Sequence, residues 1–579
     1  MSEGMRPDRK SPAARRPLRA LAGVATAVAV SLALPPAVAQ ADQPDAAGAQ
    51  TVVGELVQTW AEAGPAGHAA DDAPAAEHAP LTWVEGADGE AVRIPTEAAA
   101  GLPVGATVEV TVGGQLTDPA AEQGIEPAHD LLEAALLRSG PGAEGTPGGA
   151  LTNEVTVVRV LPPGGQEDGT SLEQLVSVVD DEVAGFWSEQ TDGGIRLGVT
   201  ATAPGWVQAT VDCSTPTLLW NEVAAAVGFR DGPGRHLLLY LADSAGTDCA
   251  YAMGEVGAGP GAGGRLYVSD LLPSVIAHEL GHNFGLGHSS GHQCDGAVEG
   301  GTCRTTAYRD YYDVMGASWD RLGALNAPQA ATLGVLPPSA QVALPADGAT
   351  TTLTLAPLAG RTGTRAVRIA DPEGGAYWLE YRAAAGRDGW LDSGDNRFML
   401  QSGVLLHRTG AMPDTSLLLD GTPAAAASWL GDLQAALVPG VPVSLSGGDV
   451  TVTVTDLGAG AATVAVTTTA RAVPRSAAPA PAHPRVLAGS TPETSDSAAD
   501  APAAGDDVPG GPPAAPVPAG DPVAGASPAG VLQAELSEVT VQTSTGNRGG
   551  SLVLAAAGLA VTALAGATVA RLRRVRRGA

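Results

Sequence analysis

Eleven consecutive residues near the middle of the chain constrain its fold more than any other stretch. They place His278, His282 and His288 in the pattern H-E-x-x-H-x-x-G-x-x-H. Residues four apart lie on one face of a helix, so His278 and His282 can present two imidazoles to one ion. Gly285 can take a positive φ angle at little cost, which lets the chain leave the helix sharply and bring back His288. Three imidazoles leave the fourth position of a tetrahedral Zn²⁺ open, as a catalytic site requires.

Glu279 directly follows the first of these histidines. On a helix this position points beside a bound ion rather than at it, which suits a general base acting on a water molecule at the metal. A bare H-E-x-x-H arises by chance in many chains, but the added glycine and third histidine make this longer form specific. We therefore expect a catalytic metal site on a helix, with Glu279 as its base.

The region from 150 to 340 resembles the metzincin zinc metalloproteases, and among them the gametolysin family of cell-wall- and matrix-degrading endopeptidases. The resemblance rests on HELGHNFGLGHSS, on the D-x-M-G turn that comes after it, and on NAPQ at 326–329. Ser289, after the third histidine, is also similar to the matrixins, the nearest rival family. The resemblance implies that Met315, within YYDVMG at 311–316, is the Met-turn methionine that forms an apolar floor beneath the zinc. The alternative for Met315 is an ordinary core residue.

Two further roles concern substrate and depend on the same resemblance. Some metzincins carry a tyrosine two residues past the methionine, near the zinc, where this chain has Ala317. Tyr308, Tyr311 and Tyr312 remain as candidates to stabilise an oxyanion, and the sequence does not choose among them. The resemblance also implies that a short edge strand at 265–269 holds extended peptide by backbone pairing, the alternative being a plain edge strand.

The charge of the chain excludes one class of partner. Asp and Glu number 62 against 32 Lys and Arg, which gives a net charge of −30. Nucleic-acid binding needs a basic footprint, so we expect no nucleic-acid partner and interpret the charge as favouring solubility. The 579 residues allow three or four domains. We expect a monomer whose partner is a protein or peptide substrate.

The two ends of the chain predict export and anchoring. Residues 1–41 combine a basic start, an apolar Ala/Val/Leu run and small-residue cleavage sites, as a secretory signal peptide does; the alternative is an uncleaved anchor. Residues 551–570 are apolar and uncharged, long enough to cross a bilayer, and the arginine-rich tail at 571–579 would stay in the cytoplasm. We therefore expect an ectodomain at the cell surface, held by one C-terminal transmembrane helix.

All four cysteines fall within the region that carries the metal motif. An even number of cysteines in an exported chain suggests disulfides, and we favour Cys213 with Cys249 and Cys294 with Cys303. The rival interpretation makes Cys294 or His292 an extra metal ligand. Three histidines already suffice for a catalytic site, which disfavours this rival.

Residues 42–150 predict a β-rich region ahead of the metal motif. The expected strands are 51–60, 81–85 and 107–112. Its position suggests a propeptide, either a folding aid or a steric inhibitor; the alternative is a permanent N-terminal domain. Many metalloprotease propeptides hold the zinc with a cysteine, but none precedes Cys213 here. Residues 138–152, rich in Gly and Pro, are the expected processing linker.

Strands and helices alternate between 151 and 340. The expected strands are 155–161, 195–202, 236–241 and 266–268, and the expected helices are 171–190 and 217–227 together with the active-site helix. Ser171 should cap the first helix, with Gln174 completing a capping box. Ser274 or Asp270 should cap the active-site helix.

The C-terminal half changes character. Residues 341–470 contain alternating strands separated by turns and predict a β-sandwich, in which His407 is structural and Trp378 and Trp390 pack in the core. Residues 471–550 are dense in Pro, Ala, Ser and Gly, a composition that cannot form a core and predicts a disordered stalk.

These patterns predict an α+β chain. Its centre is an α/β-type metzincin catalytic domain with a mixed sheet and an active-site helix. The expected order is signal peptide 1–41, propeptide-like region 42–150, catalytic domain 151–340, β-sandwich 341–470, stalk 471–550, transmembrane helix 551–570 and basic tail 571–579.

The expected function is a secreted, membrane-anchored zinc endopeptidase that hydrolyses extracellular or cell-wall proteins. Zn²⁺ is the expected cofactor, and structural Ca²⁺ is left open. One alternative is a non-catalytic, zinc-containing surface adhesin or pseudo-protease, and another is a zinc amidase acting on cell-wall cross-links. Glu279 argues against a purely structural zinc, which has no need of a base.

Overall fold

The computed structural model describes a large part of the chain. The described residues are 49–63, 79–140, 151–242, 249–318, 321–371, 374–424 and 431–469. Within them, no helix combines the length and the apolar character needed to cross a bilayer. The expectations that lie outside the described residues are the signal peptide at 1–41, the stalk at 471–550, the membrane span at 551–570 and the tail at 571–579.

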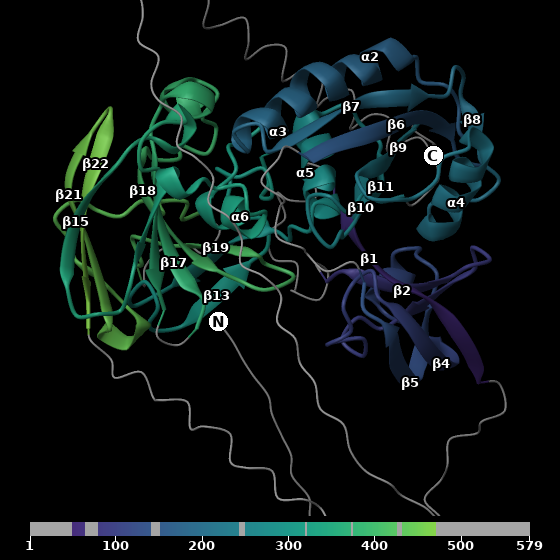
Figure 1. Ribbon diagram of the computed structural model, residues 1–579, viewed down its shortest axis with the longest axis horizontal. Helices are drawn as coiled ribbons and strands as arrows, with labels where there is room; N and C mark the ends of the chain where they lie inside the picture. The colour runs from purple at the N-terminus through teal and green to yellow at the C-terminus, as the bar shows by residue number, and fades with distance from the viewer. Residues whose placement is uncertain are drawn as a thin grey trace, which may run out of the picture. The chain divides into compact units, whose positions relative to one another are not determined.

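The described chain is a mixed α+β fold made mostly of sheet, and its largest sheet joins the N-terminal region to the next region of the chain (Figure 1). The N-terminal region contributes β1 (Gln50–Glu62), β2 (Leu81–Gly86), β3 (Ala91–Ile94), β4 (Thr107–Leu116) and β5 (Ala128–Arg138), besides the short helix α1 (Pro119–Glu122). The next region contributes β6 (Leu151–Leu161), β7 (Ile195–Thr202), β8 (Val207–Gln208), β9 (Arg235–Leu241), β10 (Ala252–Glu255) and β11 (Gly264–Val268).

The main path of this sheet runs β3-β2-β1-β10-β11-β9-β6-β7. Strand β9 is parallel to both of its neighbours, β11 and β6, and β6 is parallel to β7. The apolar runs of β9 and β6 are buried, as interior parallel strands require. Strand β10 is antiparallel to β11 and ends this parallel part. Strand β1 then pairs antiparallel with β10, so the sheet continues into the N-terminal region.

The expectation of an edge strand at 266–268 is therefore wrong. That segment belongs to β11, which lies between β9 and β10. The strand that ends the parallel part is β10, whose sequence AMGE is short and carries no alternation of apolar and polar residues. Because strand patterns are recognised by such alternation, β10 could not be found from the sequence.

The helices begin largely where the sequence predicts. The helical stretch expected at 171–190 is α2 (Leu172–Ser177), a π-helical segment η2 (Val178–Val183) and α3 (Ala184–Gln190), preceded by the capping box of Ser171 and Gln174. Helix α4 is Pro216–Val227, and helix α5, which carries the first part of the metal motif, is Pro273–Asn283.

The expected cap of α5 by Ser274 or Asp270 is wrong. Leu272 occupies the N-cap position, and no side chain caps the helix there. Pro273 comes next as the first helical residue. A proline suits that position because its fixed φ angle is helical and it has no N–H to leave unsatisfied.

The C-terminal region forms two sheets that share one hydrophobic core. The first has the order β13-β12-β19-β18-β17-β16-β14 and the second β15-β22-β21-β20. Their bounds are β12 (Ser289–Cys294), β13 (Cys303–Thr306), β14 (Gln341–Leu344), β15 (Thr350–Leu355), β16 (Ala366–Ala370), β17 (Ala376–Arg382), β18 (Gly403–Thr409), β19 (Ser416–Leu419), β20 (Val443–Leu445), β21 (Val450–Gly458) and β22 (Ala461–Thr468); helix α6 is Ala327–Thr332.

The expected domain boundary at residue 340 is crossed by this first sheet. Strand β12 begins directly after His288 and pairs in parallel with β19, so the metal motif leads straight into the C-terminal sheet. One core cluster contains Leu280 and Met315 together with Trp378 and Leu405. The 341–470 region therefore packs as part of the same body as the metal motif.

The N-terminal region likewise shares a core with the region that carries the metal motif. It has a small core of its own around Leu56 and Val108. Trp83 of β2, however, is fully buried in a cluster with Trp220 of α4 and Tyr267 of β11. Side chains as large as tryptophan dominate the energy of burial, so this contact holds the N-terminal region against the rest.

Candidate metal site

Helix α5 places the first two histidines in a fully enclosed position. Residues from Ser274 to Asn283 are all buried. The Nδ1 of His278 donates to the carbonyl of Val314 over 2.8 Å, and the Nδ1 of His282 donates to the carbonyl of Leu286 over 2.8 Å. A carbonyl can only accept, so Nδ1 carries the proton in both rings and the Nε2 lone pairs face the site.

The turn after α5 delivers the third histidine. Gly285 has a φ of +90°, and a Cβ there would lie 2.9 Å from the carbonyl oxygen of Gly257. Both observations require glycine at this position. The ring centroid of His288 then lies 5.0 Å from that of His282 and 5.5 Å from that of His278. The sequence-predicted histidines are thus brought together.

A fourth side chain, which the sequence did not predict, completes the cluster. Glu62, the last residue of β1, is buried, and its Oε1 lies 3.5, 3.4 and 3.2 Å from the Nε2 atoms of His278, His282 and His288. In a tetrahedral site with bonds of about 2.0–2.2 Å, two ligand atoms lie about 3.3–3.6 Å apart. The distances between the carboxylate and the three imidazoles match the edges of such a tetrahedron.

The charges of these four side chains also favour a bound metal ion. A carboxylate oxygen that faces imidazole lone pairs is repelled unless a cation, or protons on the rings, lies between them. Burial lowers the pKa of His282, and it lowers the pKa of His288 to about 3, so protons on these two rings are disfavoured. Neutral imidazoles are the form that binds metal. This cluster of one glutamate and three histidines could therefore hold a metal ion.

Glu279 lies beside the cluster rather than in it. Its side chain is fully buried, and within the described residues neither carboxylate oxygen has a hydrogen-bond partner. Burial first, and then the negative charge of Glu62, raises its pKa well above the usual value. For Glu62 itself, burial would raise the pKa, but the adjacent imidazoles, His278 first and then His282 and His288, hold it well below normal. A buried carboxyl group without partners is suited to exchange a proton with a molecule at the site.

The three candidate tyrosines differ in their distance from the metal cluster. The ring of Tyr308 lies 3.9 Å from that of His288, centroid to centroid, and its hydroxyl is hydrogen-bonded to Glu62. Burial, and next the charge of Glu62, raises the pKa of Tyr308 well above normal. Tyr311 instead stacks on another aromatic ring, and Tyr312 donates to a distant carbonyl. Tyr308 therefore reaches the metal cluster, whereas the other two point elsewhere.

Met315 lies against helix α5. It is fully buried, and a Cβ added at Gly281 would come within 2.3 Å of its Sδ. The turn is held from both sides, because the backbone N–H of Met315 donates to Asp313 over 2.8 Å and its carbonyl accepts from the N–H of Ser289 over 2.8 Å. Met315 thus packs against the helix that carries His278 and His282.

Trp60 closes the cluster from the side of β1. Its ring stacks on His282 with centroids 5.2 Å apart and meets His288 edge-on at 4.5 Å. Trp60 and Glu62 are two residues apart on one strand, so their side chains leave the same face of the sheet. An indole over two of the imidazoles helps to keep water away from the cluster.

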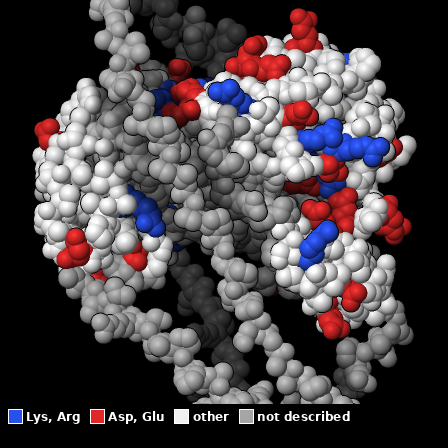
Figure 2. All heavy atoms as spheres, viewed as in Figure 1, with Lys and Arg blue, Asp and Glu red and all other residues white. Residues whose placement is uncertain are grey.

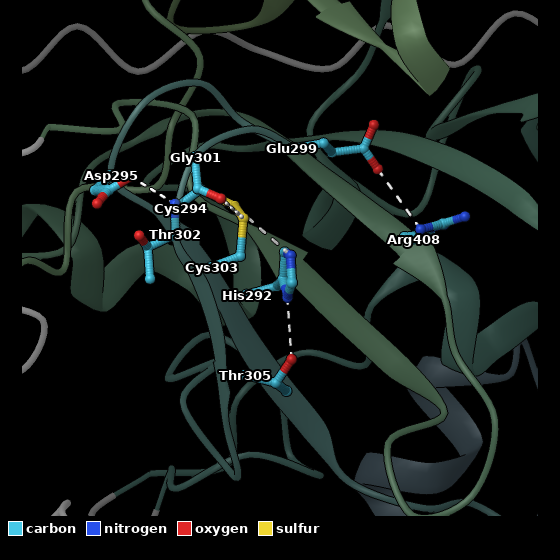
Figure 3. The surroundings of a disulfide bond; sticks show 9 residues. All are labelled: His292, Cys294, Asp295, Glu299, Gly301, Thr302, Cys303, Thr305 and Arg408. Atoms are coloured by element: carbon cyan, nitrogen blue, oxygen red, sulfur yellow. Dashed lines mark hydrogen bonds and ion pairs between the residues drawn. A yellow bond between two sulfur atoms is a disulfide. The ribbon is translucent and has the colours of Figure 1, made fainter.

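The cysteines form the two disulfides that the sequence favoured, Cys213–Cys249 and Cys294–Cys303. His292 lies near the second one, and Figure 3 shows its ring beside the sulfur atoms while its Nδ1 pairs with Thr305. The rival idea of an extra metal ligand here is not supported, because both sulfur atoms are used in the disulfide and offer no thiolate.

Comparison with known proteins gives weak likenesses. No protein-family model matches the chain, and no curated protein matches it. One similar solved structure is described as a chaperone–substrate complex, with 11% identity, a TM-score of 0.18, and coverage of 41% of this chain and 33% of that one. Another is metalloproteinase II from Bacteroides fragilis, with 12% identity, a TM-score of 0.18, and coverage of 36% and 66%. The chain thus spans a third of the length of the first and under two thirds of the second.

Proposed function

We propose that the chain is a zinc-dependent endopeptidase of the metzincin type, in which His278, His282 and His288 hold the ion. The observation that carries the proposal is the convergence of three imidazoles with Nε2 turned inward, next to a buried glutamate that has no hydrogen-bond partner among the described residues. A structural zinc site has no use for such a glutamate, whereas hydrolysis requires a group that takes and returns a proton.

The position of each group relative to the three histidines suggests its role in hydrolysis. Zinc, when bound, supplies a Lewis acid that polarises a carbonyl group and lowers the pKa of water. Glu279 takes a proton from the attacking water and returns it to the leaving nitrogen. Tyr308 lies beside His288, where its hydroxyl can donate to the oxygen that gains negative charge.

Strand β10 supports the assignment to peptide substrates. It ends the parallel part of the sheet, and a Cβ on its Gly254 would lie 2.6 Å from Glu279 Oε2. An extended peptide that pairs with β10 therefore passes next to the base and the three histidines. Addition of a strand to a sheet edge is a common way to bind peptides without reading every side chain.

The proposal includes a location outside the cell. Its support is the signal-like segment at 1–41 and the apolar segment at 551–570 in the sequence, with the two disulfides, which form in oxidising compartments. On the face shown in Figure 2, acidic and basic side chains of the described residues are interspersed without a continuous basic surface, which agrees with a protein substrate rather than a nucleic acid.

The test is cleavage of a peptide library by a full-length chain that carries an inserted site for a specific protease between Gly140 and Leu151. The protein is loaded with zinc and then cut at that site, so that the N-terminal region can leave. We expect hydrolysis that a zinc chelator abolishes, and none from the matched Glu279→Gln variant, which should retain its zinc. Hydrolysis by that variant, or zinc-loaded protein that cleaves no peptide, would overturn the proposal.

A further inference from the structure

We infer that the N-terminal region keeps the metal site closed by filling it with its own chain, with β1 in the place of an extended substrate and Glu62 as the fourth metal ligand. This inference rests on the proposed function and adds its regulation. The chain would thus be a latent enzyme. Its N-terminal region would block the metal with a glutamate, where many metalloprotease propeptides block it with a cysteine.

The first argument is the position of β1. It pairs antiparallel with β10 from Thr59 opposite Glu255 to Glu62 opposite Ala252 (Figure 1). The pairing continues at both ends, because Val256 donates its N–H to the carbonyl of Gln58 over 2.8 Å and Tyr251 donates to that of Glu62 over 2.9 Å. A peptide substrate that needs this edge cannot bind while β1 occupies it.

The second argument is the position of the carboxylate. Glu62 is fully buried, and its Oε1 stands at tetrahedral-edge distances from all three imidazoles. A catalytic zinc keeps its fourth position for water or substrate. With Glu62 in that position, neither can enter. Tyr308 is engaged at the same time, since its hydroxyl is bonded to Glu62.

The third argument is that this closed arrangement is firmly held. Arg265 of β11 is buried and donates to Glu85 of β2 over 2.6 Å and to Glu255 of β10 over 2.8 Å. The same guanidinium donates to Asn221 of α4 over 2.8 Å. Trp83 of β2 is packed in the same hydrophobic core as helix α4. An accidental contact of two regions would not bury a charge network and a tryptophan together.

A structural zinc site with four protein ligands is the competing explanation. Such a site would be stable, and its four protein ligands would keep it permanently closed to water and substrate. It leaves the buried Glu279, without a hydrogen-bond partner in the described ranges, unexplained. It also does not require that the fourth ligand come from a strand laid along the edge of the sheet. A catalytic site that is closed by β1 and can later open accounts for both the buried Glu279 and the position of β1.

The experiment measures access to the metal in the full-length, zinc-loaded chain. The probe is a fluorescent hydroxamate, which needs free coordination positions to bind zinc. We compare the unchanged chain with Glu62→Gln, and use Glu55→Gln as the matched control, because Glu55 is an exposed residue of the same strand away from the metal. If only a small fraction of the unchanged chain has its metal site open, the apparent affinity of the probe is lowered by that fraction. Glu62→Gln should therefore bind the probe about tenfold or more tightly, while Glu55→Gln behaves as the unchanged chain.

A second readout does not depend on activity or on the probe. Co²⁺ replaces zinc, and its visible absorption reports the ligand set directly. The spectrum should change in Glu62→Gln and in Glu62→Asp, whose carboxylate is drawn back by one methylene, but not in Glu55→Gln. A melting curve for each variant verifies that it is folded. Equal probe affinity and an unchanged cobalt spectrum in folded Glu62→Gln would overturn the inference. Altered spectra and probe binding without any peptide hydrolysis would instead count against the proposed function alone.

Discussion

Gly281 of helix α5 lies directly against Met315, so closely that a Cβ at Gly281 would be 2.3 Å from the Sδ and 3.0 Å from the Cε of the methionine. The glycine stands between His278 and His282 in the sequence of the helix, so the turn that carries Met315 packs against the helix that carries these two histidines. The carbonyl of Val314 in the same turn accepts from His278. The first contact sets the distance of the turn from the helix, and the second sets the orientation of the His278 ring.

This contact gives the first prediction. Gly281→Ala should lower the stability of the chain by about 1–3 kcal/mol, because overpacking of a filled core forces side chains off their rotamers or shifts the backbone. The measurement is the midpoint of urea unfolding, with zinc content determined in parallel. Gly185→Ala is the control: it lies in helix α3, and nothing stands within 4 Å of its added Cβ. That control should be neutral or gain up to about 1 kcal/mol. Equal stability of the two variants would contradict the contact.

The buried cation Arg265 gives the second prediction. Its guanidinium faces two buried or half-buried carboxylates, Glu85 and Glu255, which raise its pKa well above normal despite burial. Arg265→Met should leave both acids without a counter-charge and cost about 3–5 kcal/mol. The melting temperature of the full-length chain measures the loss. The control is Arg235→Met, since Arg235 forms a longer ion pair, 3.9 Å, with an exposed glutamate and should lose less than about 1 kcal/mol. A similar loss in both variants would show that the cluster does not hold the regions together.

The sequence predicted the parts of this site that are local in the chain. The spacing of His278 to His288 is set by one helix and one turn, and the capping box at Ser171 is set by two residues three apart, so both could be read from adjacent residues. Strand β7 matches its prediction at both ends because its pattern is regular.

The parts that were missed depend on distant pairing. Glu62 lies in a different region from the histidines, and nothing near it in the sequence distinguishes it from an ordinary glutamate at a strand end. Its role depends on the antiparallel register of β1 on β10. Tyr308, whose ring contacts His288, has a backbone φ of +59°, a left-handed conformation that a pattern of side chains does not predict. The lack of a cysteine before Cys213 excludes a cysteine ligand from the N-terminal region, but it does not exclude a carboxylate in the same place.

Tyr308 gives the third prediction. In protein whose N-terminal region has been cut from the chain, Tyr308→Phe should lower kcat by about 10- to 1000-fold with little change in KM, because the hydroxyl donates mainly to charge that develops in the transition state. Zinc content should stay the same. Tyr311→Phe serves as the control, since its ring stacks on Phe398 away from the histidines. A loss that appears in KM alone would assign Tyr308 to substrate binding instead.

Acid stability gives the fourth prediction, through His236 of β9. This side chain is fully buried between Asn153 and Asn283, and burial lowers its pKa to about 4. The unfolded chain has the ordinary His pKa of about 6.5, so between pH 6.5 and 4 it binds more protons than the folded chain does. The stability contributed by neutral His236 is therefore fully present above pH 6.5 and falls by about 3 kcal/mol as the pH drops to 4. The melting temperature of zinc-loaded protein should fall over this range, and more steeply than in His236→Gln, whose amide does not titrate. Parallel curves for the two proteins would contradict the assignment.

Removal of metal gives the fifth prediction, which separates the two histidine-containing clusters. The chain should bind one zinc, held by the histidines of α5 and the turn after it, because Cys294 and Cys303 are joined in a disulfide and have no thiolate to offer. His288→Ala should lose zinc, whereas His292→Ala should retain it. Dialysis against a chelator should lower the melting temperature of the unchanged chain, since a ligand that binds only the folded state stabilises it by mass action. The metal is counted by mass spectrometry of the elements. Two zinc ions per oxidised chain, or zinc that is lost in His292→Ala, would show that the disulfide cluster binds metal after all.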